Sequence, residues 1–142
     1  MKLATPSQED YLEFTWGLVQ AKGYARVTDL AEKLGISTAS VSKMVRRLHN
    51  EGLLTYERYR GFSLTQRGRE QGQLLYERHR TLEKFFTHLV IGTPEKVYRL
   101  VEGIEHHLDA DVMHRIESLV DYIQEYPEWW SSFLEAGDNG KG

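Results

Sequence analysis

Residues 27–48 read VTDLAEKLGISTASVSKMVRRL, and this stretch decides the architecture of the N-terminal half. Apolar residues recur at helical spacing on both sides of Gly35, and Ser37 stands directly before the second helical pattern. Two short amphipathic helices with a glycine-containing turn between them are typical of a helix-turn-helix. We therefore predict one helix over residues 29–34, capped by Thr28, and a second over residues 38–50, capped by Ser37.

Residues 54–65 predict a β-hairpin directly after these helices. The segment 54–59 alternates apolar and polar side chains, the segment 62–65 alternates back, and Arg60-Gly61 stands between them as a tight turn. A hairpin that follows the second helix of a helix-turn-helix is a wing. Residues 1–72 are therefore predicted to form a winged helix-turn-helix DNA-binding domain.

The second helix of this motif and the wing carry side chains suited to DNA. Short polar residues at the start of the helix can approach base edges, and basic residues farther along it can reach phosphates or guanine. Arginines on the wing can contact phosphates or the minor groove. The expected DNA-binding residues are Ser37, Thr38, Ala39, Ser40, Ser42, Lys43, Arg46, Arg47, Arg58 and Arg60.

The charge of the chain is unevenly distributed, although its net value is only −3. Residues 1–72 hold 11 Lys and Arg against 8 Asp and Glu, whereas residues 73–142 hold 7 against 13. The basic first half favours a polyanion as its partner. The acidic second half favours cations or a separate partner.

The composition excludes several classes of protein. There is no cysteine, so disulfides, thiolate metal sites and cysteine nucleophiles are impossible. No run of about 18 apolar residues is present for a membrane span, and the first residues lack the apolar core of a signal peptide. We expect a cytoplasmic protein that does not associate with a membrane.

Residues 73–142 are predicted to form an all-helical domain. A long helix that Thr65 caps should run to about residue 89, and Thr93-Pro94 should begin the next helix. Asp109 should cap a further helix over residues 110–126, which Pro127 ends. The apolar stripes of these helices exceed what so small a domain can bury, which predicts a homodimer.

The C-terminal segment is rich in aromatic residues. Trp129, Trp130, Phe133 and Leu134 are too apolar to remain in water, so we expect a short turn that docks on the core or on a partner chain. Residues 136–142 are expected to be a frayed tail.

Residues 101–108, VEGIEHHL, contain potential metal ligands. Glu102, Glu105 and His106 stand at positions i, i+3 and i+4, so on a helix they share one face. Three such donors on one face indicate a metal site. By itself, the pattern fits an ordinary solvated polar face equally well.

Further donors lie elsewhere in the chain. Asp10 and Glu13 share a face of a first predicted helix, which Ser7 caps and Gly23 ends near residue 22. Acidic residues there could simply interact with the helix dipole. His79 lies in the middle of the long helix, where a single histidine is more often structural than a ligand.

The whole pattern resembles the manganese-responsive transcriptional repressors of the DtxR family, in the two-domain form without an SH3-like domain. The resemblance extends over nearly the whole chain. The segments that carry it are 5–13 (TPSQEDYLE), 22–27 (KGYARV), 59–61 (YRG), 76–79 (YERH) and 101–108 (VEGIEHHL).

The resemblance implies a binuclear site for two Mn²⁺ ions per subunit, with helix 1 contributing ligands to the second domain. It also implies a homodimer that binds double-stranded operator DNA with Mn²⁺ as corepressor and represses manganese-uptake genes. Oxygen-rich ligands suit Mn²⁺, and Cd²⁺, Zn²⁺ or Fe²⁺ could bind as well. The ligands that the resemblance implies are Asp10, Glu13, His79, Glu102, Glu105 and His106.

Two alternatives stay open at this stage. A winged-helix regulator could sense another divalent metal, such as Fe²⁺ or Zn²⁺. A di-metal carboxylate enzyme is a remote alternative, because such enzymes use paired Glu-x-x-His motifs on facing helices and would leave the wing unexplained. We expect a regulator without enzymatic activity or a small organic substrate.

Overall fold

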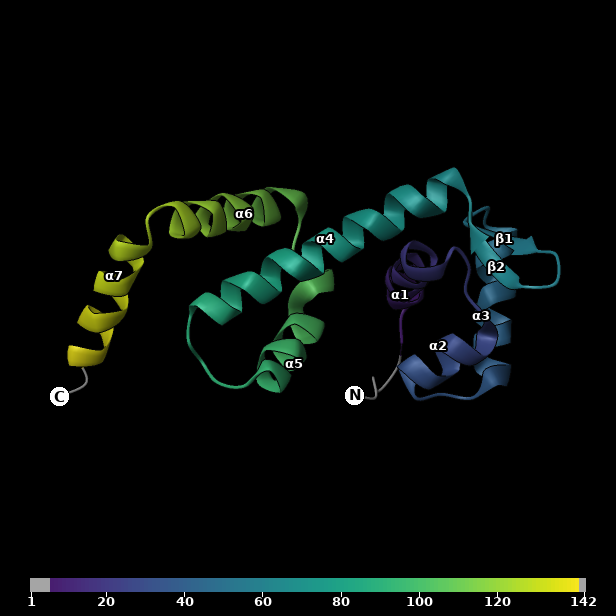
Figure 1. The fold of residues 1–142 in the computed structure, drawn as a ribbon, viewed down its shortest axis with the longest axis horizontal. Coiled ribbons are helices and arrows are strands. Elements are labelled where there is room, and N and C mark those ends of the chain that lie inside the picture. Colours follow the sequence, from purple (N-terminus) through teal and green to yellow (C-terminus); the bar gives the residue numbers. More distant parts are fainter. Residues whose placement is uncertain (1–5, 141–142) are drawn as a thin grey trace. The chain divides into compact units, whose positions relative to one another are not determined.

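The computed structural model describes residues 6–140, and the chain divides into two compact units, residues 1–77 and 78–142 (Figure 1). The fold is mostly α, with one two-stranded sheet in the first unit. The elements of the first unit are α1 (Gln8–Lys22), α2 (Val27–Leu34), α3 (Thr38–Asn50), β1 (Leu54–Glu57), β2 (Gly61–Leu64) and the first part of α4 (Gln66–His88).

One apolar core joins the elements of the first unit. Leu12 of α1, Leu30 of α2 and Val41 of α3 are buried in it, together with Phe62 of the hairpin. Leu75, from the first part of α4, packs against the same cluster. The helix-turn-helix and its wing are therefore a single packed body, as the sequence predicts.

The start of α1 has the predicted cap in a more elaborate form. The Asp10 backbone N–H donates to Ser7 Oγ at 3.2 Å, and the Ser7 backbone N–H donates to Asp10 Oδ2 at 2.7 Å. This reciprocal arrangement is a capping box. Gly23 adopts a left-handed conformation, with φ of 86°, and ends the helix as predicted.

The start of α2 differs from the prediction by a few residues. Thr28 does not cap this helix: α2 begins at Val27, and Arg26 holds the cap position. The Asp29 carboxylate accepts the backbone N–H of Arg26 at 2.9 Å. Asp29 lies three residues beyond the cap, so its side chain allows the helix to begin two residues earlier than a Thr28 cap would. Ser37 caps α3 as predicted.

The wing has a longer turn than predicted. The antiparallel strands pair Leu54 with Leu64 and Glu57 with Gly61, so residues 58–60 form the turn and Gly61 belongs to the second strand. Tyr59 takes the left-handed conformation in that turn, with φ of 69°. The wing is also anchored at its base, because Ala25 and Phe62 exchange backbone hydrogen bonds of 2.8 and 2.9 Å.

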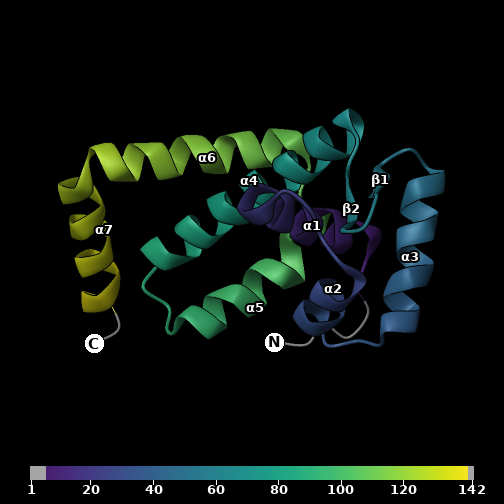
Figure 2. The same cartoon turned by 45° about the vertical axis from the view of Figure 1, so that its right-hand side comes forward.

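The second unit is entirely helical within the described residues. It contains the second part of α4, α5 (Pro94–Ile104), a 3₁₀ turn η1 (Glu105–His107), α6 (Ala110–Glu125) and α7 (Pro127–Asn139). Leu82, Val97, Val101 and Met113 form its core. The two ribbon views agree that α5 lies beside the second part of α4 (Figures 1 and 2). The helix α5 begins at Pro94, as predicted, with Thr93 as its cap. Asp109 caps α6, as predicted.

The end of α5 corrects an assumption behind the predicted metal face. The α-helix stops at Ile104, so Glu105 and His106 lie on η1 rather than on the same α-helix as Glu102. The physical reason is Arg78 of α4, whose Nη2 donates to the Glu105 carbonyl oxygen at 2.6 Å and to that of Leu108. A side chain thus satisfies a carbonyl that a continuing α-helix would use internally.

The C-terminal prediction is also wrong in part. Pro127 ends α6, but it is the first residue of α7 rather than of a short turn, and residues 136–139 are helical rather than frayed. Trp130 is buried, and its indole N–H donates to the His88 carbonyl oxygen at 2.8 Å. Residues 141 and 142 of the expected tail lie outside the described residues. Among residues 6–140, no helix has both the length and the apolar character needed to cross a membrane.

Candidate metal centre and DNA-contacting surface

Four of the predicted metal ligands converge within the second unit. His79 comes from the middle of α4, Glu102 from the last turn of α5, and Glu105 and His106 from η1. His79, Glu102 and Glu105 each offer one donor atom within 4.8 Å of the others. Long-range packing of α4 on α5 and η1 therefore gathers donors that lie more than twenty residues apart in the chain.

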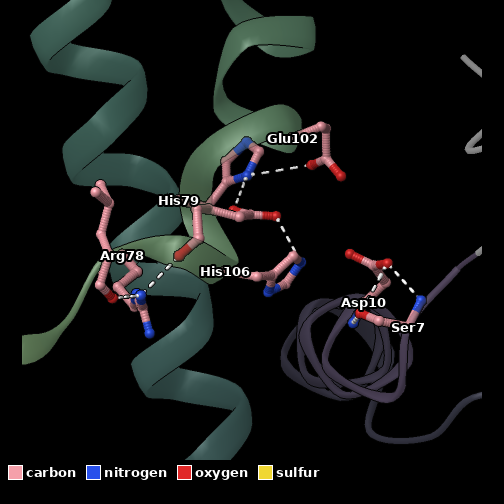
Figure 3. A network of polar contacts seen from close by, with 8 residues as sticks. Ser7, Asp10, Arg78, His79, Glu102 and His106 are labelled. Atoms are coloured by element: carbon pink, nitrogen blue, oxygen red, sulfur yellow. Dashed lines mark hydrogen bonds and ion pairs between the residues drawn. The ribbon is translucent and has the colours of Figure 1, made fainter.

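The ring of His79 is the centre of this cluster. Its Nδ1 lies 3.0 Å from Glu105 Oε2 and 3.4 Å from Glu102 Oε1 (Figure 3). Glu105 also reaches the second imidazole, because its Oε1 lies 3.5 Å from His106 Nε2. A single carboxylate thus stands between two histidine rings.

The donors are suited chemically to a divalent cation. The side chains of Glu102 and Glu105 are only 8% and 3% exposed, although both are carboxylates directed at one ring nitrogen. Close, buried carboxylates repel when both are ionised, and a bound cation removes that repulsion. Carboxylate oxygens and imidazole nitrogens are ligands that Mn²⁺, Fe²⁺ and Zn²⁺ accept. The residues therefore fit a metal ion.

Arg78 supports the cluster in a way that the sequence did not reveal. Its guanidinium holds the backbone of η1, the turn that carries Glu105 and His106 (Figure 3). Arg78 precedes His79 on α4, so one helix supplies both a donor and the side chain that fixes two others. The only sequence signal was the adjacency of Arg78 to His79, which does not predict a contact with residues near position 105.

Asp10 and Glu13, the other two predicted ligands, belong to the first unit. They lie three residues apart on α1, which places them on one face of that helix. Asp10 Oδ2 takes part in the capping box, with Ser7 Oγ also donating to it at 3.0 Å (Figure 3). A carboxylate has about four lone-pair positions, so capping leaves capacity for a metal bond.

The predicted DNA-contacting residues lie on an exposed face of the first unit. Ser37 to Ser40 and the basic residues of α3 are exposed, and Ser42 is half-buried. Arg47 Nε lies 3.3 Å from Glu51 Oε1, an exposed pair that competition from phosphate could open. The exposed residues of this surface are Ser37, Thr38, Ala39, Ser40, Lys43, Arg46, Arg47, Arg58 and Arg60.

Arg26 is a basic residue near the wing that the sequence did not single out. Its Nε donates to the Arg60 carbonyl oxygen at 3.2 Å. The guanidinium groups of Arg26 and Arg60 both lie about 5 Å from the centre of the Tyr24 ring, at 5.2 and 5.0 Å. Tyr24 and Arg26 therefore brace the turn of the wing.

A winged helix-turn-helix followed by a helical unit with clustered carboxylates and imidazoles defines a class of protein: metal-responsive DNA-binding regulators. Two family models match the chain. "Iron dependent repressor, N-terminal DNA binding domain" matches residues 4–62, and "Iron dependent repressor, metal binding and dimerisation domain" matches residues 65–129. The chain belongs to this iron-dependent repressor family, the DtxR family, whose members are transcriptional regulators and not enzymes.

Curated relatives and solved structures agree with this assignment. The HTH-type transcriptional regulator MntR of Geobacillus kaustophilus is 50% identical over 123 residues, which are 87% of this chain and 86% of that one. The MntR of Bacillus subtilis is 48% identical over 124 residues, with the same shares of 87% and 86%. The structure of the manganese regulator SloR is similar with a TM-score of 0.74 and 29% identity, over 83% of this chain and 55% of that chain.

Proposed function

We propose that this protein is a manganese-activated transcriptional repressor with a binuclear metal site. Its ligands are the four donors of the second unit together with Asp10 and Glu13 of α1. The observation that carries the proposal is the position of Glu105, because its two oxygens face two different imidazoles. Together with the two imidazoles, this carboxylate would help to hold the metal ions in the site.

The total charge of the six proposed ligands supports a site for two metal ions. Four carboxylates with two neutral imidazoles carry four negative charges, which two divalent cations would cancel. Oxygen-rich donors without any sulfur ligand favour manganese over softer metals. Relatives at 44–50% identity are named MntR, and a solved repressor at 27% identity is described as a complex with manganese.

The metal would act by linking α1 to the second unit. Asp10 and Glu13 lie on α1, which belongs to the same packed body as α3, the recognition helix of the helix-turn-helix. A metal that fixes α1 would therefore also fix the position of α3. We propose that Mn²⁺ selects the arrangement in which both recognition helices of a homodimer match operator half-sites about 34 Å apart. As a regulator, it would act in the cytoplasm and repress manganese-uptake genes.

The dimer would use the helical unit. One matching family model is described as a metal binding and dimerisation domain. Tyr122, Trp129 and Phe133 are 48%, 45% and 55% exposed. Aromatic side chains this exposed are often buried against a partner chain.

A DNA-binding titration tests this function. A promoter fragment of a manganese transporter is titrated at fixed salt with metal-free protein and with protein that carries Mn²⁺, Fe²⁺ or Zn²⁺. We expect strong binding with Mn²⁺ and weak binding without metal. Equal binding in every condition would refute metal-dependent repression.

The variant Glu102→Ala tests the site. It should lose Mn²⁺-dependent DNA binding while its far-ultraviolet circular dichroism stays unchanged. Glu95→Ala, at an exposed position in the first turn of α5, is the matched control. Retained Mn²⁺-dependent binding in Glu102→Ala would reject the proposed ligands.

A different activating metal is the second candidate. The matching models are described as iron dependent repressors, and a solved relative at 29% identity, ScaR, is described with bound Zn²⁺ or Cd²⁺. The same titration decides between the metals, because the activating ion is the one that gives the strongest DNA binding at equal free concentration.

A further inference from the structure

The second nitrogen of the His79 ring faces a carboxylate that no ligand assignment uses. His79 Nε2 lies 3.5 Å from Glu83 Oε2, one helical turn farther along α4. The Nδ1 of the same ring faces Glu102 and Glu105. The imidazole is thus held between carboxylates on both of its nitrogen sides.

A neutral imidazole can bind a metal with only one nitrogen and must carry its proton on the other. If Nδ1 is the metal ligand, the proton belongs on Nε2. A carboxylate that accepts this proton in a hydrogen bond favours the correct tautomer and makes Nδ1 a better donor. Glu83 is the residue in that position.

The residues packed around His79 also restrict the orientation of its ring. Tyr98 of α5 packs beside it, with ring centres 5.7 Å apart. The side chain of His79 is 11% exposed, whereas that of Glu83 is 50% exposed. Glu83 therefore reaches a buried ring from the solvent side, opposite to the ligand cluster.

We propose that Glu83 is a positioning residue that accepts the Nε2–H of His79 and holds the ring in the tautomer whose Nδ1 binds the metal. This inference rests on the proposed function, because it assumes His79 to be a ligand. Glu83 itself does not bind the metal. Its effect on metal affinity passes entirely through the ring.

The test compares three variants of the full-length protein by calorimetric titration with Mn²⁺. Glu83→Ala should weaken Mn²⁺ binding by about 10-fold or more, in the range typical of carboxylates that orient metal-bound histidines. Glu83→Gln, which keeps an acceptor oxygen, should bind more tightly than Glu83→Ala. Glu77→Ala removes the same charge from an exposed site on α4 and should bind as the wild type does.

A second readout separates positioning from a general charge effect. In protein loaded with diamagnetic Cd²⁺, the Nε2–H proton of His79 is followed by ¹⁵N-edited NMR. We expect a downfield, slowly exchanging resonance in the wild type that shifts or disappears in Glu83→Ala and stays in place in Glu77→Ala. An unchanged resonance, or equal Mn²⁺ affinities of these two variants, would overturn the proposal.

A further variant, His79→Ala, shows whether a negative result concerns Glu83 alone or the whole proposed metal site. If the wild type binds Mn²⁺ and His79→Ala does not, the site stands whatever Glu83→Ala shows. If His79→Ala binds Mn²⁺ as tightly as the wild type, or the wild type does not bind it, both proposals fail. Thermal unfolding of each variant shows whether the helical unit is intact.

Discussion

At the scale of single residues, Asp29 shows how one carboxylate organises a helix start. Lys22 Nζ donates to Asp29 Oδ2 at 2.7 Å, and the Arg26 backbone N–H donates to the same oxygen at 2.9 Å. The hydrogen bond from Lys22 lowers the pKa of Asp29 below its ordinary value of 3.8, with the Arg26 N–H acting in the same direction. The stabilisation is therefore present above pH 3.8 and is lost as the pH falls through the lowered folded value.

We predict that Asp29→Asn destabilises the first unit by about 1 kcal/mol at neutral pH, since it removes a charge-assisted contact that is partly screened by solvent. Thermal unfolding of the two proteins between pH 7 and about pH 2 measures the difference, which should shrink at the acid end. Glu32→Gln, at an exposed position on the same helix, is the control and should change stability little. A difference that stays constant over this pH range would contradict the role of the ionised carboxylate.

Arg78 holds the turn that carries Glu105 and His106, so the shape of the cluster of candidate ligands depends on it. Its fork-shaped guanidinium reaches two carbonyl groups at once, which the single ammonium of lysine cannot reproduce with the same geometry. Arg78→Lys should therefore weaken Mn²⁺ binding by about 10-fold, as is typical when a residue that supports metal ligands is changed. Calorimetric titration gives the affinity. The control is Arg80→Lys, at an exposed position two residues away. Equal affinity of the two variants would show that the hydrogen bonds of Arg78 to the Glu105 and Leu108 carbonyls do not support the site.

At the scale of elements, the wing depends on a glycine in its second strand. Gly61 has φ of 131°, a conformation that side chains disfavour, and a Cβ there would collide with the Ala25 carbonyl. Gly61→Ala should destabilise the first unit by about 1–3 kcal/mol and weaken DNA binding, because the wing must separate from Ala25. Thermal unfolding and DNA titration check both effects.

Gly17→Ala is the matched control for the wing. Gly17 lies inside α1, and a Cβ at this position meets no atom within 4 Å. Alanine has a higher helix propensity than glycine, so this change should stabilise the protein by up to about 1 kcal/mol. If Gly61→Ala were as stable as Gly17→Ala, the close approach of the wing to Ala25 would not hold in solution.

At the scale of the whole molecule, the basic first half should make DNA binding strongly dependent on salt. Between 50 and 200 mM salt, a protein with 6–10 phosphate contacts loses about 10³–10⁵ in affinity. The Mn²⁺-loaded protein should show a linear decrease of log affinity with log salt. Lys43→Ala, which removes one exposed cation of α3, should lower the slope by about 1. Fluorescence anisotropy across a salt series measures this slope, and Lys33→Ala, at an exposed position on α2, is the control.

The metal should have an effect on stability that does not require DNA. A ligand that binds the folded state raises the unfolding free energy by RT ln(1 + [L]/Kd), which is about 2.7 kcal/mol at 100 times Kd. Mn²⁺ should therefore raise the unfolding temperature of the wild type but not of His79→Ala. Scanning calorimetry with and without Mn²⁺ checks this, and an equal shift in both proteins would place the bound metal elsewhere.

Much of the fold was predictable because its signals are local. The caps at Ser7, Ser37 and Asp109 and the glycine stop at Gly23 are read from a few adjacent residues, and the structure confirms them. Helical spacing of apolar residues likewise predicts which face of α3 is buried. The candidate ligands of the second unit were also predictable by residue type, although the resemblance to a known family was needed to select them.

The sequence by itself thus determined the order of the elements, the absence of thiolate ligands and the kinds of donor available. Tertiary structure decided how these donors meet. The stop of α5 at Ile104, the 3₁₀ turn that follows it and the approach of Glu83 to His79 are not visible in any short pattern. The first two depend on Arg78, which contacts residues 27 and 30 positions away in the chain. Local propensity acts over one or two helical turns, whereas the geometry of a metal cluster is set by the packing of helices that are distant in sequence.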